Sequence, residues 1–317
     1  MSGSPTPATA APGAAPGTSA AGAPLGSIYD LGYRRYEGRR LGRRHAVSAL
    51  VRDSLRSCFG IGRSGRAKLI PFGLAGLALL PAVVAIGVVG LAQQLGTGAQ
   101  AEAISPVRYA TYYGLIAQLL FMFAAAQAPE LLGRDLRHRV LSLLFSRALR
   151  RTDYVIAKVV AVVVALLLVQ LVPQLVIFLG RALSSTDVSR AVSADVGSLP
   201  AVVGQAALAA VLLASISLAI ASFSARRSYA TAGIIVAFVL PPLVAGVLRN
   251  GASARDAGRV AALVSPSDVL DATNRWLFGL PDSSRIGVDG PASAAIAVAI
   301  SAIALAVLVV RYRRMPT

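Results

Sequence analysis

The chain has 317 residues, of which 56% are hydrophobic and 14% charged, and its formal net charge is +17. Soluble globular domains carry about a quarter charged residues, so this composition excludes an ordinary soluble domain. The single cysteine, Cys58, excludes an internal disulfide framework. With one cysteine and two histidines, neither a zinc site nor another metal centre or cofactor is expected.

The first 26 residues are almost entirely Ala, Gly, Pro, Ser and Thr, with no charge and no periodicity. Such a segment buries too little apolar surface to offset its conformational entropy, so residues 1–26 are expected to be a disordered, dispensable tail. They have neither the basic start nor the apolar stretch of a signal peptide.

Residues 27–68 form a strongly basic segment. Within it, apolar residues recur at helical spacing: Val47, Leu50, Val51, Leu55, Cys58 and Phe59. This pattern predicts an amphipathic helix in the membrane interface before the first span, with packing on protein as the alternative. The following Gly60-Ile-Gly62-Arg-Ser-Gly65 matches G-x-G-x-x-G, but no strand precedes it, so a turn is expected and not a dinucleotide site.

Six apolar stretches are each about as long as the ~20 residues that cross a bilayer as a helix. They predict an all-α, polytopic membrane domain over residues 69–314. The predicted spans are Leu69–Leu95, Tyr109–Ala128, Val155–Gly180, Ala201–Ala225, Tyr229–Leu248 and Ala292–Val310.

The basic residues are unevenly divided between the two sides of these spans. Segments 27–68, 129–158, 225–228 and 311–317 hold 23 of the 31 Lys and Arg residues. The positive-inside rule therefore places both termini in the cytoplasm, with the chain in the cell (plasma) membrane. Attraction to an anionic leaflet explains this charge better than binding to nucleic acid does.

Catalytic motifs are missing from the sequence. No G-x-x-x-x-G-K-[ST] occurs, so the chain has no P-loop, and no nucleophile–His–acid set stands out; we do not expect an enzyme. The predicted spans contain no Asp, Glu, His or Arg, which argues against an ion-coupled carrier. Gln170 and Gln174 share a helix face and could line a polar pathway, although hydrogen bonds between helices are the alternative.

The segment between the second and third spans is amphipathic. Leu132, Leu136, Val140, Leu143 and Leu144 fall on one helical face, whereas the basic residues point elsewhere. This spacing predicts a short cytoplasmic helix, a basic turn, and then a span capped by Thr152 or Asp153.

At this segment the chain resembles the permease subunits of type-2 (exporter-like) ABC transporters, and the similarity in layout extends over about residues 29–314. The matching residues are Glu130, Asp135, Leu141, Leu143, Leu144, Ser146, Arg147, Arg151, Tyr154 and Lys158. The proline that the family has after the first arginine is replaced here by Ala148. The resemblance implies export, energised by a separate ATP-binding subunit, with a second permease chain that is either identical or related.

The same resemblance implies that the cytoplasmic segment docks on the ATP-binding subunit. The expected docking residues are Glu130, Arg134, Asp135, Leu143, Leu144, Arg147, Arg151 and Tyr154. We expect the two leucines to be buried anchors and Arg147 and Arg151 to pair with acids of the partner. Glu130 and Asp135 are expected to pair locally, with Arg134 or Arg139.

Three alternatives remain open. The segment could rest on lipid headgroups, with its arginines on phosphates. The chain could be a membrane scaffold or assembly protein without transport. Less readily, it could be a membrane enzyme that uses the outer segment 249–291.

Overall fold

The computed structural model describes residues 38, 41–97, 107–138, 144, 149–185, 188–250, 255–281 and 286–314. The chain divides into residues 1–40 and residues 41–317, and the description below concerns the second unit. The expected disordered tail at residues 1–26 lies outside the described residues.

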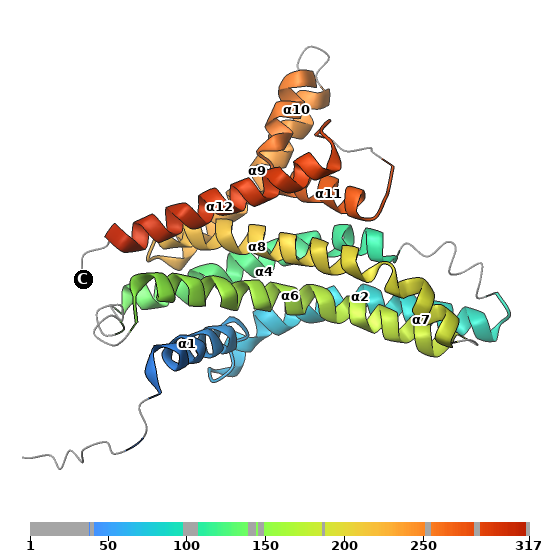
Figure 1. The fold of residues 1–317 in the computed structure, drawn as a ribbon, viewed down its shortest axis with the longest axis horizontal. Helices are drawn as coiled ribbons and strands as arrows, with labels where there is room; N and C mark the ends of the chain where they lie inside the picture. Colours follow the sequence, from blue (N-terminus) through green and yellow to red (C-terminus); the bar gives the residue numbers. More distant parts are fainter. Residues whose placement is uncertain are drawn as a thin grey trace, which may run out of the picture. The chain divides into compact units, whose positions relative to one another are not determined.

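Six of the described helices are long and apolar enough to cross a membrane. The prediction of an all-helical chain with six helices that could span a membrane is confirmed for the described part of the chain (Figure 1). The spans are α2 (Gly65–Gln94), α4 (Tyr109–Arg137), α6 (Arg151–Ser184), α8 (Leu199–Ser222), α9 (Arg227–Asn250) and α12 (Gly290–Arg314).

The six spans differ in the share of their residues that is buried inside the bundle. In the most apolar window of α4 and of α8, 61% of the residues are buried, whereas the value is 11% for α2 and 17% for α9. The inner helices approach closely through small residues such as Ala165 and Ala209, both fully buried. The outer helices expose large apolar side chains, among them Leu80 and Leu243. An apolar exterior of this extent suits lipid, because monomeric soluble proteins rarely expose contiguous apolar patches larger than a few hundred Å².

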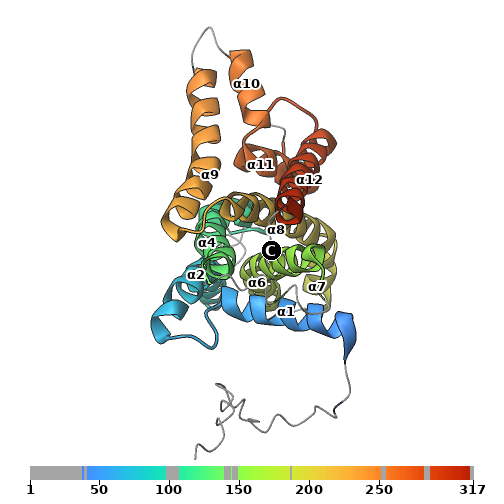
Figure 2. The same cartoon turned by 90° about the vertical axis from the view of Figure 1, so that its left-hand side faces the viewer.

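The predicted amphipathic helix is α1 (Gly42–Cys58). It packs against α6 and α4, and Figure 2, which looks along the bundle, shows it lying crosswise on the flank of the bundle, below α6. Ser54 and Cys58 are buried, while Leu50, Leu55 and Phe59 pack against the core. Part of the apolar face therefore contacts protein, as in the alternative weighed for this helix.

A glycine turn joins α1 to α2. Gly60 has φ +67°, and a Cβ added there would lie 2.6 Å from the carbonyl oxygen of Ala67. Gly62 also has a positive φ, +87°. Gly60 is thus required both by its positive φ and by the closeness of the Ala67 carbonyl oxygen. The expected turn is confirmed.

Three short helices lie in segments that the sequence analysis treated as connections: α7 (Val188–Val196), α10 (Arg255–Leu263) and α11 (Pro266–Leu277). α10 packs along α9, and both rise away from the other spans in Figures 1 and 2. The Oγ of Ser265 caps α11 by accepting from the Asp268 N–H at 3.3 Å.

Hydrogen bonds join the short helix α11 to two spans. The side-chain amide of Asn274 donates to the carbonyl oxygen of Ala110 in α4 at 2.8 Å, and the hydroxyls of Thr273 and Ser293 lie 3.0 Å apart. Gly290 at the start of α12 sits against Trp276, so closely that a Cβ there would overlap the indole. The segment 249–291 is therefore partly folded onto the spans.

Candidate docking and coupling site

Two acidic residues near the end of α4 form ion pairs with basic residues from distant parts of the chain. Glu130 receives a hydrogen bond from Arg63, which lies in the turn before α2. Its second oxygen, Oε2, lies 3.1 Å from Nη1 of Arg227, at the start of α9. One carboxylate, whose side chain is 16% exposed, therefore holds three elements together.

The second acid, Asp135, joins α4 to α6. Its Oδ2 lies 2.8 Å from Nζ of Lys158 and accepts a hydrogen bond from the hydroxyl of Tyr154 at 2.7 Å. The ring of Tyr154 is fully buried and lies 5.3 Å from that of Tyr312, near the end of α12. The side chain of Lys158 is only 6% exposed, so this charge depends on Asp135 for compensation.

The start of α6 is tied to two further helices. Arg43 of α1 donates two hydrogen bonds to Asp153, at 2.7 and 2.6 Å. Asp153 also accepts from the backbone N–H of Arg150 at 3.0 Å, so it caps the helix from its third position and not as the N-cap residue. Nη1 of Arg151 donates to the carbonyl oxygen of Arg313 in α12 at 2.8 Å.

We refer to Glu130, Asp135, Asp153 and their basic partners as the ion-pair cluster. It brings together the ends of α1, α4, α6 and α9 and the turn before α2, and the hydrogen bond from Arg151 to Arg313 adds the end of α12. The helices on either side of segment 138–150 are therefore joined by ion pairs and hydrogen bonds to α1, α9 and α12.

Several expected docking residues have a different setting from the one predicted. Glu130 and Asp135 were expected to pair locally, but the partners described for them come from α6, from α9 and from the turn before α2. Arg139, Leu143 and Arg147 lie outside the described residues. Leu144 is helical and partly buried against the core, and Arg134 is half-buried.

A short helix separate from the second span was expected to include Leu132 and Leu136, but residues 130–137 continue α4 without a break. Leu131 and Leu132 are buried, and Gly133 comes close to the carbonyl oxygen of Ala225. Packing of this last part of α4 on the bundle outweighs the helix-ending tendency of Pro129, which lies inside the helix.

The two glutamines proposed to line a pathway are buried. Nε2 of Gln170 donates to Oε1 of Gln205 in α8, which is the hydrogen bond between helices that was the alternative. Oε1 of Gln174 and Nε2 of Gln205 are buried without a hydrogen-bond partner. Among the residues that the structure describes, no group of three His, Cys, Asp or Glu side chains could hold a metal ion.

Cys58 lies at the end of α1, near Lys158 of the ion-pair cluster, and only 1% of its surface is exposed. Burial raises the pKa of the Cys58 thiol to about 12, so the reactive thiolate is scarce at neutral pH. We expect the folded protein to resist N-ethylmaleimide at pH 7.5 and still at pH 9.5, whereas the denatured chain reacts within minutes. Mass spectrometry of intact protein measures the labelling; rapid labelling of the folded form would contradict the burial of this helix end.

The six apolar helices and their lipid-suited exterior define a multi-pass membrane protein. No protein-family model matches the chain, and a search of curated proteins finds no match.

Proposed function

We propose that this chain is the membrane-spanning permease subunit of an ABC transporter of the type-2 class, working as an exporter in the cell membrane. A separate ATP-binding subunit supplies the energy, and a second permease chain, identical or related, completes the pathway. The proposal rests first on the resemblance of residues 130–158 to the permease subunits of this class.

The ion-pair cluster is the observation that carries the proposal. A transporter driven by a separate subunit needs an attachment point from which displacement reaches several spans. Segment 138–150 is flanked by the end of α4 and the start of α6, and these ends are tied to α1, α9 and α12 by Arg43, Arg227 and Arg313. A push on this segment is therefore passed to most of the bundle.

Replacing Leu143 and Leu144 together by aspartate tests the docking segment. In membranes from the native host, a P-loop ATPase is expected to co-purify with the full-length wild-type chain and to be lost with the double variant. Burying two carboxylates in an apolar interface costs several kcal/mol. The control Ile61→Asp places the same change on an exposed side chain in the turn before α2 and should keep the ATPase bound.

The outcomes have separate meanings. If no P-loop ATPase accompanies the wild-type chain, the transporter proposal is wrong. If the ATPase stays with the double variant at wild-type yield while helix content is unchanged, the segment is instead a membrane anchor.

The orientation is tested with reporter fusions. The excess of basic residues predicts that fusions at Arg226 and Thr317 are cytoplasmic, whereas fusions at Ala99 and Asp282 are external. Alkaline phosphatase is active outside and green fluorescent protein inside, so the pair of reporters assigns each position. An external C-terminus would overturn the orientation.

A further inference from the structure

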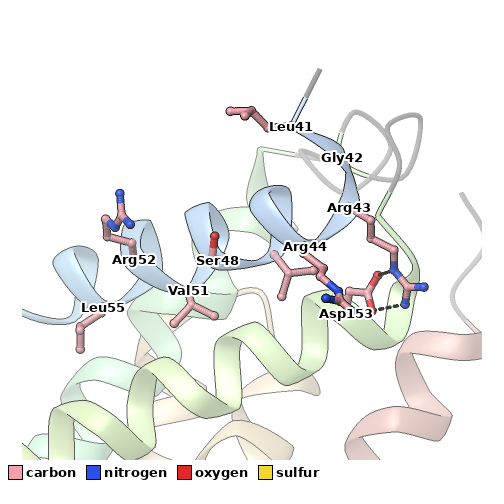
Figure 3. Close-up of a pocket in the computed structure, with 10 residues that line it drawn as sticks. Leu41, Gly42, Arg43, Arg44, Ser48, Val51, Arg52, Leu55 and Asp153 are labelled. Atoms are coloured by element: carbon pink, nitrogen blue, oxygen red, sulfur yellow. Dashed lines mark hydrogen bonds and ion pairs between the residues drawn. The ribbon is translucent and has the colours of Figure 1, made fainter. Parts of the chain in front are cut away.

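A groove runs along one flank of α1, at the end of the bundle where α6 begins (Figure 3). Its volume is about 1080 Å³, and Val47, Val51 and Leu55 form its apolar floor. Figure 3 shows Val51 and Leu55 turned toward α6, while Ser48 and Arg52 point away from it at the rim. The groove is thus apolar inside and polar at its edge.

Three arginines line the groove, and only one of them has an ion-pair partner among the described residues. Arg43 is paired with Asp153, as described above. Arg44 and Arg52 also line the groove, and neither forms an ion pair with any residue that the structure describes. Two guanidinium groups without an ion-pair partner among the described residues, beside an apolar lining, suit a ligand that is anionic at one end and apolar at the other.

The groove lies beside the point where α6 changes from charged to apolar residues. Beside it, α6 passes from charged Arg151 and Asp153 to the apolar run that starts at Val155. The neighbouring α2 changes in the same way, between Lys68 and Leu69. Such a transition marks the boundary between water and hydrocarbon in a membrane protein.

We infer that this groove binds an anionic phospholipid from the adjacent leaflet. The phosphate lies at the rim with Arg44 and Arg52, and an acyl chain covers Val47, Val51 and Leu55. The lipid would fill the space between α1 and the spans and hold the helix against the bundle, together with the Arg43–Asp153 pair. The inference does not depend on the proposed transport function.

Native mass spectrometry of the full-length protein, titrated with phosphatidylglycerol or phosphatidylcholine in detergent, tests the site. The wild-type chain is expected to bind one phosphatidylglycerol molecule in preference to phosphatidylcholine. In Arg44→Gln/Arg52→Gln the affinity for that molecule should fall about 30-fold, because two basic contacts are lost. The charge-matched control Arg56→Gln/Arg66→Gln removes two exposed arginines that do not line the groove, and should keep the preference.

A second pair of variants leaves the charge unchanged. Ser48→Trp fills the groove from its rim and should displace the lipid, whereas Ala49→Trp, exposed and outside the groove, should not. Equal losses in both arginine doublets would reveal diffuse attraction to the basic surface and overturn the site. Unchanged lipid binding in Ser48→Trp would do so too, and if that variant instead lost a protein partner, the groove would be a protein-docking surface.

Discussion

Replacing Lys158 by methionine should destabilise the folded protein by about 3–5 kcal/mol, because it leaves the Asp135 carboxylate without its charge partner in a largely buried setting. Only the hydroxyl of Tyr154 would still donate to this carboxylate among the contacts described here. Unfolding by sodium dodecyl sulfate in mixed micelles, followed by circular dichroism, measures the loss. The control Arg259→Met breaks an exposed pair with Asp256 and should change stability by less than about 1 kcal/mol.

The double variant Lys158→Met/Asp135→Leu separates the cost of an uncompensated charge from the value of the pair. Removing both charges should recover much of the lost stability, since a buried ion pair is often replaceable by apolar residues of similar volume. If Lys158→Met were as stable as the wild type, the Asp135 carboxylate would be compensated by water or by another cation. The Lys158–Asp135 pair would then not be a buried link between α4 and α6.

Replacing Glu130 by glutamine should loosen two segments that are far apart in the sequence. The amide keeps the shape of the side chain but loses the charge that attracts Arg63 and Arg227. Because Arg227 is 45% exposed and Arg63 24%, solvent screening limits the expected loss to about 1–2 kcal/mol. Hydrogen–deuterium exchange should accelerate in the turn before α2 and in the first turn of α9 together.

The matched control is Asp256→Asn, whose carboxylate is almost fully exposed and pairs only locally, with Arg259. It should leave exchange in both segments unchanged. If Glu130→Gln accelerated exchange in the turn but not in α9, Glu130 would not link the two elements.

The spans could be predicted because each one is recognisable from its own run of apolar residues. A helix in lipid must be apolar over about 20 residues, whatever its neighbours, so α6 and α12 are visible as runs of Val, Leu and Ala. The ends were less accurate, since the last turns of α4 are held by packing of Leu131 and Leu132 on other helices.

The ion-pair cluster could not be predicted, because its partners are set by the tertiary fold. Glu130 and Asp135 were recognised, but Arg63 and Arg227 entered the sequence analysis only as charges in a topology count. Nothing in their local spacing relates them to an acid in α4. The start of the short helix α11 has a local signal in the sequence, because Ser265 followed by Pro266 and Asp268 is a standard helix start.

The contact between Trp276 and Gly290 gives the chain a natural optical probe. Trp276, the only tryptophan of the sequence, lies in α11 against Gly290 at the start of α12, whereas Tyr312 packs on Tyr154 beside the ion-pair cluster, near the other end of α12. The two points are separated by roughly 33 Å along a helix of 1.5 Å rise per residue. If an event at the ion-pair cluster shifts the emission of Trp276, the conformational change must therefore extend across the thickness of the membrane.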